Sequence, residues 1–114
     1  MSKLNVINWQ NVEFGEKIEI LPLAHNAASK EIRIVMPKDC VMKEHQAPFA
    51  IFVQVLRGRI WFACGEERVE MGEGEMVSLV ANEPHSLGGL ENSVVRLSLG
   101  VGDSVERVSK VLKL

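Results

Sequence analysis

Short apolar stretches of four to eight residues recur along this chain of 114 residues, and turn-forming residues separate each stretch from the next. Several separators contain glycine, as in Arg57-Gly58, Gly65-Glu66-Glu67, Gly72-Glu73-Gly74 and Gly88-Gly89. Glycine is typical of the tight turns that join antiparallel strands. Many short strands at this spacing predict an all-β fold, an antiparallel sandwich or barrel, and not alternating βα units. The expected strands cover residues 17–21, 31–36, 49–56, 60–64, 68–71, 76–80, 84–87 and 94–101.

The last residues of the chain follow a different period. The apolar residues at helical spacing there are Val105, Val108 and Leu112. This spacing predicts a short C-terminal helix over about residues 104–113. Asp103, followed three residues later by Glu106, has the pattern of a capping box at the start of that helix.

Length and charge narrow the class of protein. A chain of this length has the usual size of one domain, so residues 1–114 are expected to form a single domain with its barrel core over about residues 17–101. Thirteen Lys and Arg residues against fifteen Asp and Glu residues give a formal net charge of -2, with the signs interspersed. The sequence therefore predicts no basic surface for nucleic acid or for an anionic membrane.

The compartment follows from segments that are missing. Residues 1–10 lack the apolar core of a secretory signal, and the longest run without charged or strongly polar residues, residues 47–53, is too short to span a bilayer. Cys40 and Cys64 form no Cys-x-x-Cys pattern and are expected to be buried thiols in a reducing compartment. A cytoplasmic protein is therefore expected.

The stretch from residue 49 to residue 56 is apolar on both faces, with Gln54 as its one polar residue. A strand with one face in water normally alternates between apolar and polar residues, so both faces of this strand need a cover. The simplest cover is a second copy of the chain, which predicts a homodimer. The two faces are expected to carry Phe52 and Leu56 on one side and Ile51, Val53 and Val55 on the other.

Three histidines are the main candidates for chemistry. His25 lies in a polar, turn-like stretch after Pro22 and is expected in an exposed loop. His45 and His85 each lie at the edge of an expected strand. Both are therefore expected to point into one barrel, where imidazoles serve as metal ligands or as polar anchors for a ligand.

The surroundings of His45 resemble the first motif of the cupin superfamily, Gly-x5-His-x-His-x3-4-Glu-x6-Gly. His45 falls on its first histidine and Gly58 on its closing glycine. Asp39 replaces the opening glycine, Ala47 the second histidine and Ile51 the glutamate.

The surroundings of His85 are similar to the second cupin motif, Gly-x5-Pro-x-Gly-x2-His-x3-Asn. Gly74 matches its first glycine and His85 its histidine. Val80, Asn82 and Gly89 replace the proline, the second glycine and the asparagine.

The resemblance spans about Ile32 to Leu99, and the stretch His45-Gln46-Ala47-Pro48 is similar to a subgroup of small stand-alone cupins with alanine at the second histidine position. It implies an antiparallel β-barrel or jelly roll of roughly six to eight strands, commonly dimeric. The usual cupin site is a divalent metal held by three histidines and a glutamate. Residues 45, 47 and 51 are expected on one face of a strand, so that Ala47 and Ile51 stand where ligands normally do.

Three functions remain open at this point. The first is a homodimeric ligand-binding or sensory barrel with a degenerate metal site. Its small-molecule pocket is lined by Ala47, Ile51, Val53 and Val55, with His45 and His85 as polar anchors. The second is a metal-dependent cupin enzyme in which His45, His85 and water hold a weakly bound divalent transition metal (Zn, Ni, Fe or Mn). The third is a scaffold without pocket chemistry.

The absence of tyrosine removes one further reaction class. Sugar isomerases and epimerases of cupin type generally pair a histidine base with a tyrosine acid. No such pair can form in this chain.

Overall fold

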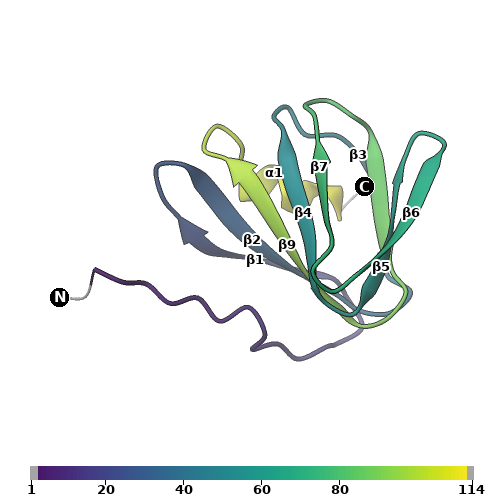
Figure 1. The fold of residues 1–114 in the computed structure, drawn as a ribbon, viewed down its shortest axis with the longest axis horizontal. Coiled ribbons are helices and arrows are strands. Elements are labelled where there is room, and N and C mark those ends of the chain that lie inside the picture. The colour runs from purple at the N-terminus through teal and green to yellow at the C-terminus, as the bar shows by residue number, and fades with distance from the viewer. Residues whose placement is uncertain (1–2, 113–114) are drawn as a thin grey trace.

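The computed structural model describes residues 3–112 (Figure 1), and these form nine strands and one helix. The strands are β1 (Glu19–His25), β2 (Ser29–Met36), β3 (Val41–His45), β4 (Ile51–Arg57), β5 (Arg59–Cys64), β6 (Glu67–Gly72), β7 (Met76–Leu79), β8 (His85–Gly89) and β9 (Ser93–Gly100), and the helix is α1 (Val105–Val111). None of the helical residues described belongs to a segment long and apolar enough to cross a membrane.

The strands form two antiparallel sheets that enclose the core. One sheet has the order β1-β2-β9-β4-β7, and the other has the order β3-β8-β5-β6. Figure 1 shows their strands converging at one end of the molecule and spreading apart at the other. Helix α1 contacts β1 of the first sheet and β3 of the second. The predicted all-β antiparallel fold with a short C-terminal helix is confirmed.

Alternation along β4 places the core between the sheets. Ile51, Val53 and Val55 are buried, whereas Phe52 on the opposite face is 47% exposed. The two faces predicted for this strand are therefore confirmed. On the neighbouring strand β9, every second residue from Val95 also points into the core.

The chain itself covers part of the outer face of the five-stranded sheet. Trp9 lies 6.0 Å from the Arg96 guanidinium, and Gln10 Nε2 donates to Leu56 O at 3.2 Å. On this face Val35 and Val94 are fully buried, and the nearby Arg33 and Arg57 contact Asn11 and Phe14 of the N-terminal segment. Phe52 and Met76 lie on the same face and stay exposed. Only part of this outer face is therefore left exposed in the described residues, and the homodimer stays a prediction.

Strand β1 continues through Pro22, where the sequence predicted its end. Proline is tolerated here because β1 is an edge strand, and the register shifts between Pro22 and Ala24. His25 is consequently the last residue of β1 and is exposed, instead of lying in a loop.

Strand β3 was not among the predicted strands, because of its five residues Met42 alone is fully buried. Its presence corrects the expectation that residues 45, 47 and 51 share one strand. His45 ends β3 and Ile51 begins β4, with Pro48 in the connection between them. Ala47 and Ile51 are nevertheless both buried.

Gly88 and Gly89 lie inside β8, although the sequence predicted a turn there. A Cβ atom at Gly88 would lie 2.5 Å from the indole nitrogen of Trp61, and one at Gly89 would lie 2.7 Å from the carbonyl oxygen of Pro37. These glycines therefore serve close packing within the sheet and not a turn.

The C-terminal helix has a different cap from the predicted one. Ser104 is the N-cap, and its side chain accepts from the Arg107 amide at 3.2 Å. Asp103 pairs instead with the Arg107 side chain. The predicted helix extended to Lys113, which lies outside the described residues.

Candidate functional site

His45 and His85 lie side by side on neighbouring strands of the four-stranded sheet. They are Cα partners in the pairing of β3 with β8, so their side chains leave the same face. Their ring centroids are 4.2 Å apart in an edge-to-face arrangement, and Phe62 of β5 stacks on the His85 ring at 5.4 Å. The structure thus brings together the two histidines that the sequence singled out.

Each imidazole is held through one nitrogen by a backbone carbonyl. His45 Nδ1 lies 2.6 Å from Lys43 O, and His85 Nδ1 lies 2.9 Å from Glu83 O. A carbonyl oxygen only accepts hydrogen bonds, so each Nδ1 carries the proton. In the neutral ring, Nε2 then keeps its lone pair and is the atom available to a ligand.

Burial keeps both rings neutral. It lowers the pKa of His45, and it lowers the pKa of His85, against a smaller raising effect of the two carbonyl contacts. The positive charge of Arg107 lowers the pKa of both residues further, and His45 contributes to the lowered pKa of His85. At pH 7 the site therefore presents two hydrogen-bond acceptors.

The two histidines open onto a narrow cavity inside the barrel. Its volume is about 20 Å³, which is room for about one water molecule. The lining residues are Ile34, Met42, His45, Ile51, Val53, His85, Leu87, Leu97, Arg107 and Val108. Of the residues expected to line a pocket, Ile51 and Val53 do so. Ala47 and Val55 are buried but belong to the surrounding core.

Helix α1 closes this cavity with Arg107 and Val108, which sequence reasoning did not assign to the site. Asp103 holds Arg107 through two bonds, from Nε at 2.6 Å and from Nη2 at 2.9 Å. Arg107 Nη1 also lies 3.4 Å from Gln46 O, in the connection between β3 and β4. The available sequence signal was the opposite charge of Asp103 and Arg107 four residues apart.

The cupin resemblance implies a metal, and the donor set can be compared with that role. The cavity offers two neutral imidazoles and no carboxylate, whereas catalytic zinc usually takes three protein ligands. Within residues 3–112, no three His, Cys, Asp or Glu side chains come together in a group able to hold a metal ion. Arg107 adds a positive charge beside both rings. These residues do not fit tight binding of a divalent cation.

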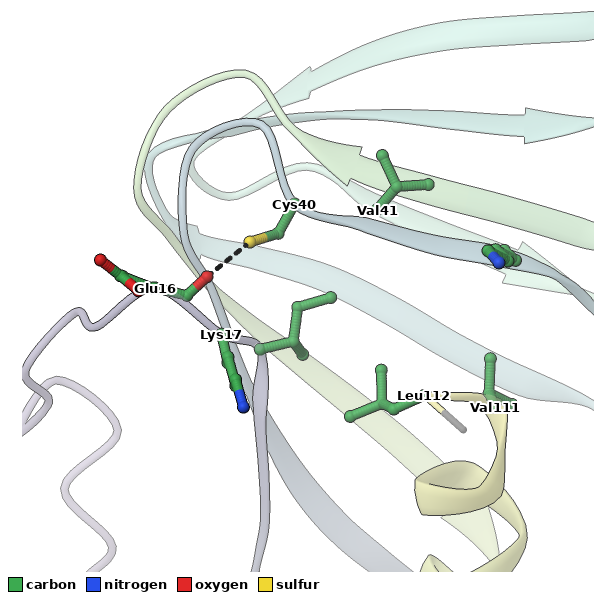
Figure 2. A pocket seen from close by; sticks show the side chains of 8 residues that line it. Glu16, Lys17, Cys40, Val41, Val111 and Leu112 are labelled. Atoms are coloured by element: carbon green, nitrogen blue, oxygen red, sulfur yellow. Dashed lines mark hydrogen bonds between the residues drawn. The ribbon is translucent and has the colours of Figure 1, made fainter. Parts of the chain in front are cut away.

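A larger hollow of about 330 Å³ lies on the surface, apart from the histidines (Figure 2). Cys40 and Val41 form one side of it, the segment before β1 forms a second, and the end of α1 forms a third. Cys40 Sγ contacts Glu16 O at 3.4 Å, as the dashed line shows. The remaining lining residues are Lys17, Ile18, Lys43, Val111 and Leu112.

Both cysteines are free thiols, but they are half-buried and not buried as predicted. Cys64 Sγ lies 3.7 Å from the Glu83 carboxylate. Burial, followed by the negative charge of Glu83, raises the pKa of Cys64. Its thiol is therefore protonated and a poor nucleophile at neutral pH.

The lowered histidine pKa values predict how stability depends on pH. The unfolded chain binds protons near the ordinary histidine pKa of 6.5, at which folded His45 and His85 still resist protonation. The free energy of unfolding is therefore expected to be constant above about pH 7 and to fall as the pH is lowered below about 6.5. Urea denaturation at several pH values measures this loss, at about 1.4 kcal/mol for each unit by which a pKa differs between the two states.

Replacing both His45 and His85 by glutamine is expected to flatten this pH dependence. The matched control is His25→Gln, which removes an exposed histidine outside the cavity and should keep the wild-type slope. Burial alone would raise the pKa of Glu31, but hydrogen bonds from Arg96, Ser98 and Ser29 lower it, and the pKa is lowered overall. Measurements above pH 5 therefore exclude the titration of this carboxylate. An unchanged slope in the double variant would contradict the assignment.

Comparison with known proteins places the chain among cupin barrels. The sequence profile of the family described as AraC-like ligand binding domain matches residues 32–93, more than half of the chain. No curated protein matches the sequence of this chain. The structure is similar to a cupin superfamily protein from Desulfitobacterium hafniense, with a TM-score of 0.76 and 9% identity over 89% of this chain and 94% of that one.

Two further solved structures are similar. An RmlC-like cupin family protein with a double-stranded β-helix fold from Methanocaldococcus jannaschii has a TM-score of 0.70 and 12% identity over 96% of this chain and 99% of that one. A cupin 2 conserved barrel domain protein from Leptotrichia buccalis has a TM-score of 0.69 and 27% identity over 78% of this chain and 44% of that one. These likenesses confirm the cupin-type fold.

Proposed function

Because this chain belongs to the family of AraC-like ligand-binding domains in the cupin superfamily, we propose that it is a ligand-binding or sensory barrel for one small molecule. The molecule binds where His45, His85 and α1 meet. One observation carries this proposal: two adjacent imidazoles, each fixed through Nδ1, present Nε2 acceptors in a cavity that is otherwise lined by apolar side chains and Arg107. Small-molecule sites generally combine an apolar lining with a few fixed polar groups.

The narrow cavity implies a movement on binding. A volume of about 20 Å³ does not admit an organic molecule, so its neighbours must move for one to enter. The wall that belongs to neither sheet is α1, a seven-residue helix. The bound state is therefore expected to have α1 displaced from the histidines.

A screen for bound molecules tests the proposal. Purified protein is analysed by native mass spectrometry and by thermal unfolding against small neutral polyols, acids and amines. We expect at least one class to raise the unfolding temperature of the wild type and of the control His25→Gln, but not of His85→Gln. Binding that is insensitive to both His45→Gln and His85→Gln would place the ligand elsewhere, and no binding at all would favour a scaffold.

Elemental analysis separates this function from a metal-dependent enzyme. Given the two-imidazole donor set, protein prepared without chelator and incubated with Zn²⁺, Ni²⁺, Fe²⁺ or Mn²⁺ is expected to retain less than about a tenth of an equivalent after desalting. Retention of one equivalent of metal by the wild type, and its loss in His45→Gln and in His85→Gln, would instead support a metal-dependent enzyme.

We also expect a homodimer that buries the uncovered part of the five-stranded sheet. This part is a shallow hollow of about 210 Å³ lined by Phe52, Gln54, Met76, Arg96 and Ser98. Light scattering after size exclusion is expected to give twice the chain mass for the wild type and the monomer mass for Phe52→Glu. Val69→Glu is the control, because Val69 is similarly exposed (45%, against 47% for Phe52) but lies on the other sheet. A monomeric wild type at micromolar concentration would contradict this expectation.

A further inference from the structure

The cavity beside the histidines has an uneven charge. Arg107 is the one permanently charged group among its lining residues, and no carboxylate lines it. The positive charge reaches both imidazoles, since it lowers the pKa of His45 and of His85. An anionic group is therefore favoured at this position, and a cation is disfavoured.

Asp103 fixes the direction of the Arg107 side chain from behind. The Asp103 carboxylate is almost fully buried and does not line the cavity. It accepts from Arg107 Nε and Nη2 and from the Ser104 amide at 2.8 Å. A salt bridge of this geometry uses one edge of the guanidinium, which carries five N–H donors in all.

The other edge of the guanidinium is weakly engaged. Its one hydrogen bond there runs from Nη1 to Gln46 O, at a long 3.4 Å. Arg107 therefore retains N–H donors beside the imidazoles, and a carboxylate is the group that such a planar pair of donors binds best.

We propose that the ligand is a short-chain 2-hydroxy carboxylate. Its carboxylate binds the weakly engaged edge of Arg107, and its hydroxyl donates to Nε2 of His45 or His85. The aliphatic lining, which includes Ile51 and Val53, accepts a short apolar tail. This assignment rests on the proposed function and specifies the chemical class of its ligand.

The assignment gives α1 a second role. The helix that closes the cavity also carries the carboxylate-binding residue, since Arg107 and Val108 belong to α1. The Arg107 side chain holds the bound carboxylate beside the histidines, while Val108 moves away with the helix to leave space for the tail. Ligand binding is thereby linked to the position of the C-terminal helix.

The test compares three probes of nearly equal size: lactate, propanoate and lactamide. Binding is followed by calorimetry and by the Nε2 resonances of His45 and His85 in histidine-selective ¹⁵N spectra. Lactate is expected to bind at least about tenfold more tightly than lactamide, which lacks the charge, with propanoate between them. Lactate is also expected to shift the Nε2 resonances of the cavity histidines and not those of His25.

Variants separate a binding role of Arg107 from a purely structural one. Arg107→Gln is expected to abolish the preference for lactate over lactamide, and Arg107→Lys, which keeps the charge, is expected to retain part of it. If Arg107→Gln does not fold, the comparison of Arg107→Lys with the wild type decides. The control is Arg68→Gln, because Arg68 stacks on Trp61 outside the cavity.

The outcomes distinguish this assignment from the proposed function. Equal binding of lactate and lactamide, or a preference that survives Arg107→Gln, would overturn the carboxylate assignment. Histidine-dependent binding of a neutral polyol without any binding of lactate would overturn it too, while leaving the ligand-binding barrel intact. Binding of no small molecule of any class would overturn both.

Discussion

Replacing Gly58 by alanine is expected to lower the free energy of unfolding by about 3 kcal/mol or more. Gly58 joins β4 to β5 with φ of +85°, a conformation that side chains disfavour. A Cβ atom there would also collide with the carbonyl oxygen of Asn92 and lie 2.5 Å from Ser93 Oγ. A backbone carbonyl cannot rotate away as a side chain can, so the strand junction itself must shift. The midpoint of urea denaturation measures the loss.

Gly74→Ala is the matched control for this substitution. Gly74 has nearly the same φ, +87°, but a Cβ atom there meets nothing within 4 Å. Its replacement should cost only the conformational penalty, about 1 kcal/mol. Equal losses in the two variants would show that the close approach to Asn92 has no energetic weight.

Replacing Asp103 by asparagine is expected to destabilise the protein by about 2 kcal/mol or more. The Asp103 side chain is 1% exposed and accepts three hydrogen bonds, two of them from Arg107. The asparagine amide has the same shape but no charge, and its NH₂ group would face the N–H donors of Arg107 or Ser104, with which it cannot form a hydrogen bond. Helix α1 is expected to loosen first, so its amides should exchange hydrogen faster than those of the sheets.

Glu106→Gln makes the same chemical change one turn away. Glu106 is exposed in the first turn of α1, so its loss should cost no more than about 0.5 kcal/mol. Unfolding measured by urea, together with hydrogen exchange of residues 105–111, compares the two variants. An Asp103→Asn protein as stable as Glu106→Gln would mean that the Asp103–Arg107 pair does not hold the helix.

The sequence allowed much of this fold to be predicted, because most of its strands have strong local signals. β4 is marked by a nearly continuous apolar run, β9 alternates in burial from Val95 onward, and the turn at Gly58 carries the residue that its conformation requires. His45 and His85 were found through the spacing of two weak motifs, and the strand register then placed them opposite each other. Local pattern and tertiary structure agree at these positions.

The errors fall where tertiary contacts outweigh local pattern. β3 carries two consecutive charged residues and one fully buried side chain, so no alternation marks it as a strand. Gly88 has the composition of a turn, yet the indole of Trp61 occupies the space that a side chain would need. Neither feature can be read without knowing which strands become neighbours.

The part of the site contributed by α1 was unpredictable for a related reason. The apolar spacing of the helix indicates that one face is buried, but not what lies beneath it. Docking against β1 and β3 brings Arg107 to the histidines, more than 20 residues from either in sequence. Long-range packing also brings the N-terminal segment to the outer face of the five-stranded sheet, where Gln10 contacts Leu56. Sequence reasoning had assigned the cover of residues 49–56 on this face to a second chain.

The two tryptophans give this protein separate optical reporters. The chain has no tyrosine, so its near-ultraviolet fluorescence comes from Trp9 and Trp61. Trp9 lies over the outer face of the five-stranded sheet, near Arg96, whereas Trp61 belongs to the four-stranded sheet, under Arg68. In a Trp9→Phe variant the emission comes from Trp61 alone, which lies in the sheet that carries the histidines. In a Trp61→Phe variant it comes from Trp9 alone, which lies in the N-terminal segment that covers part of the other sheet. Coincident denaturation curves of the two variants would establish that the cover and the barrel unfold as one cooperative unit.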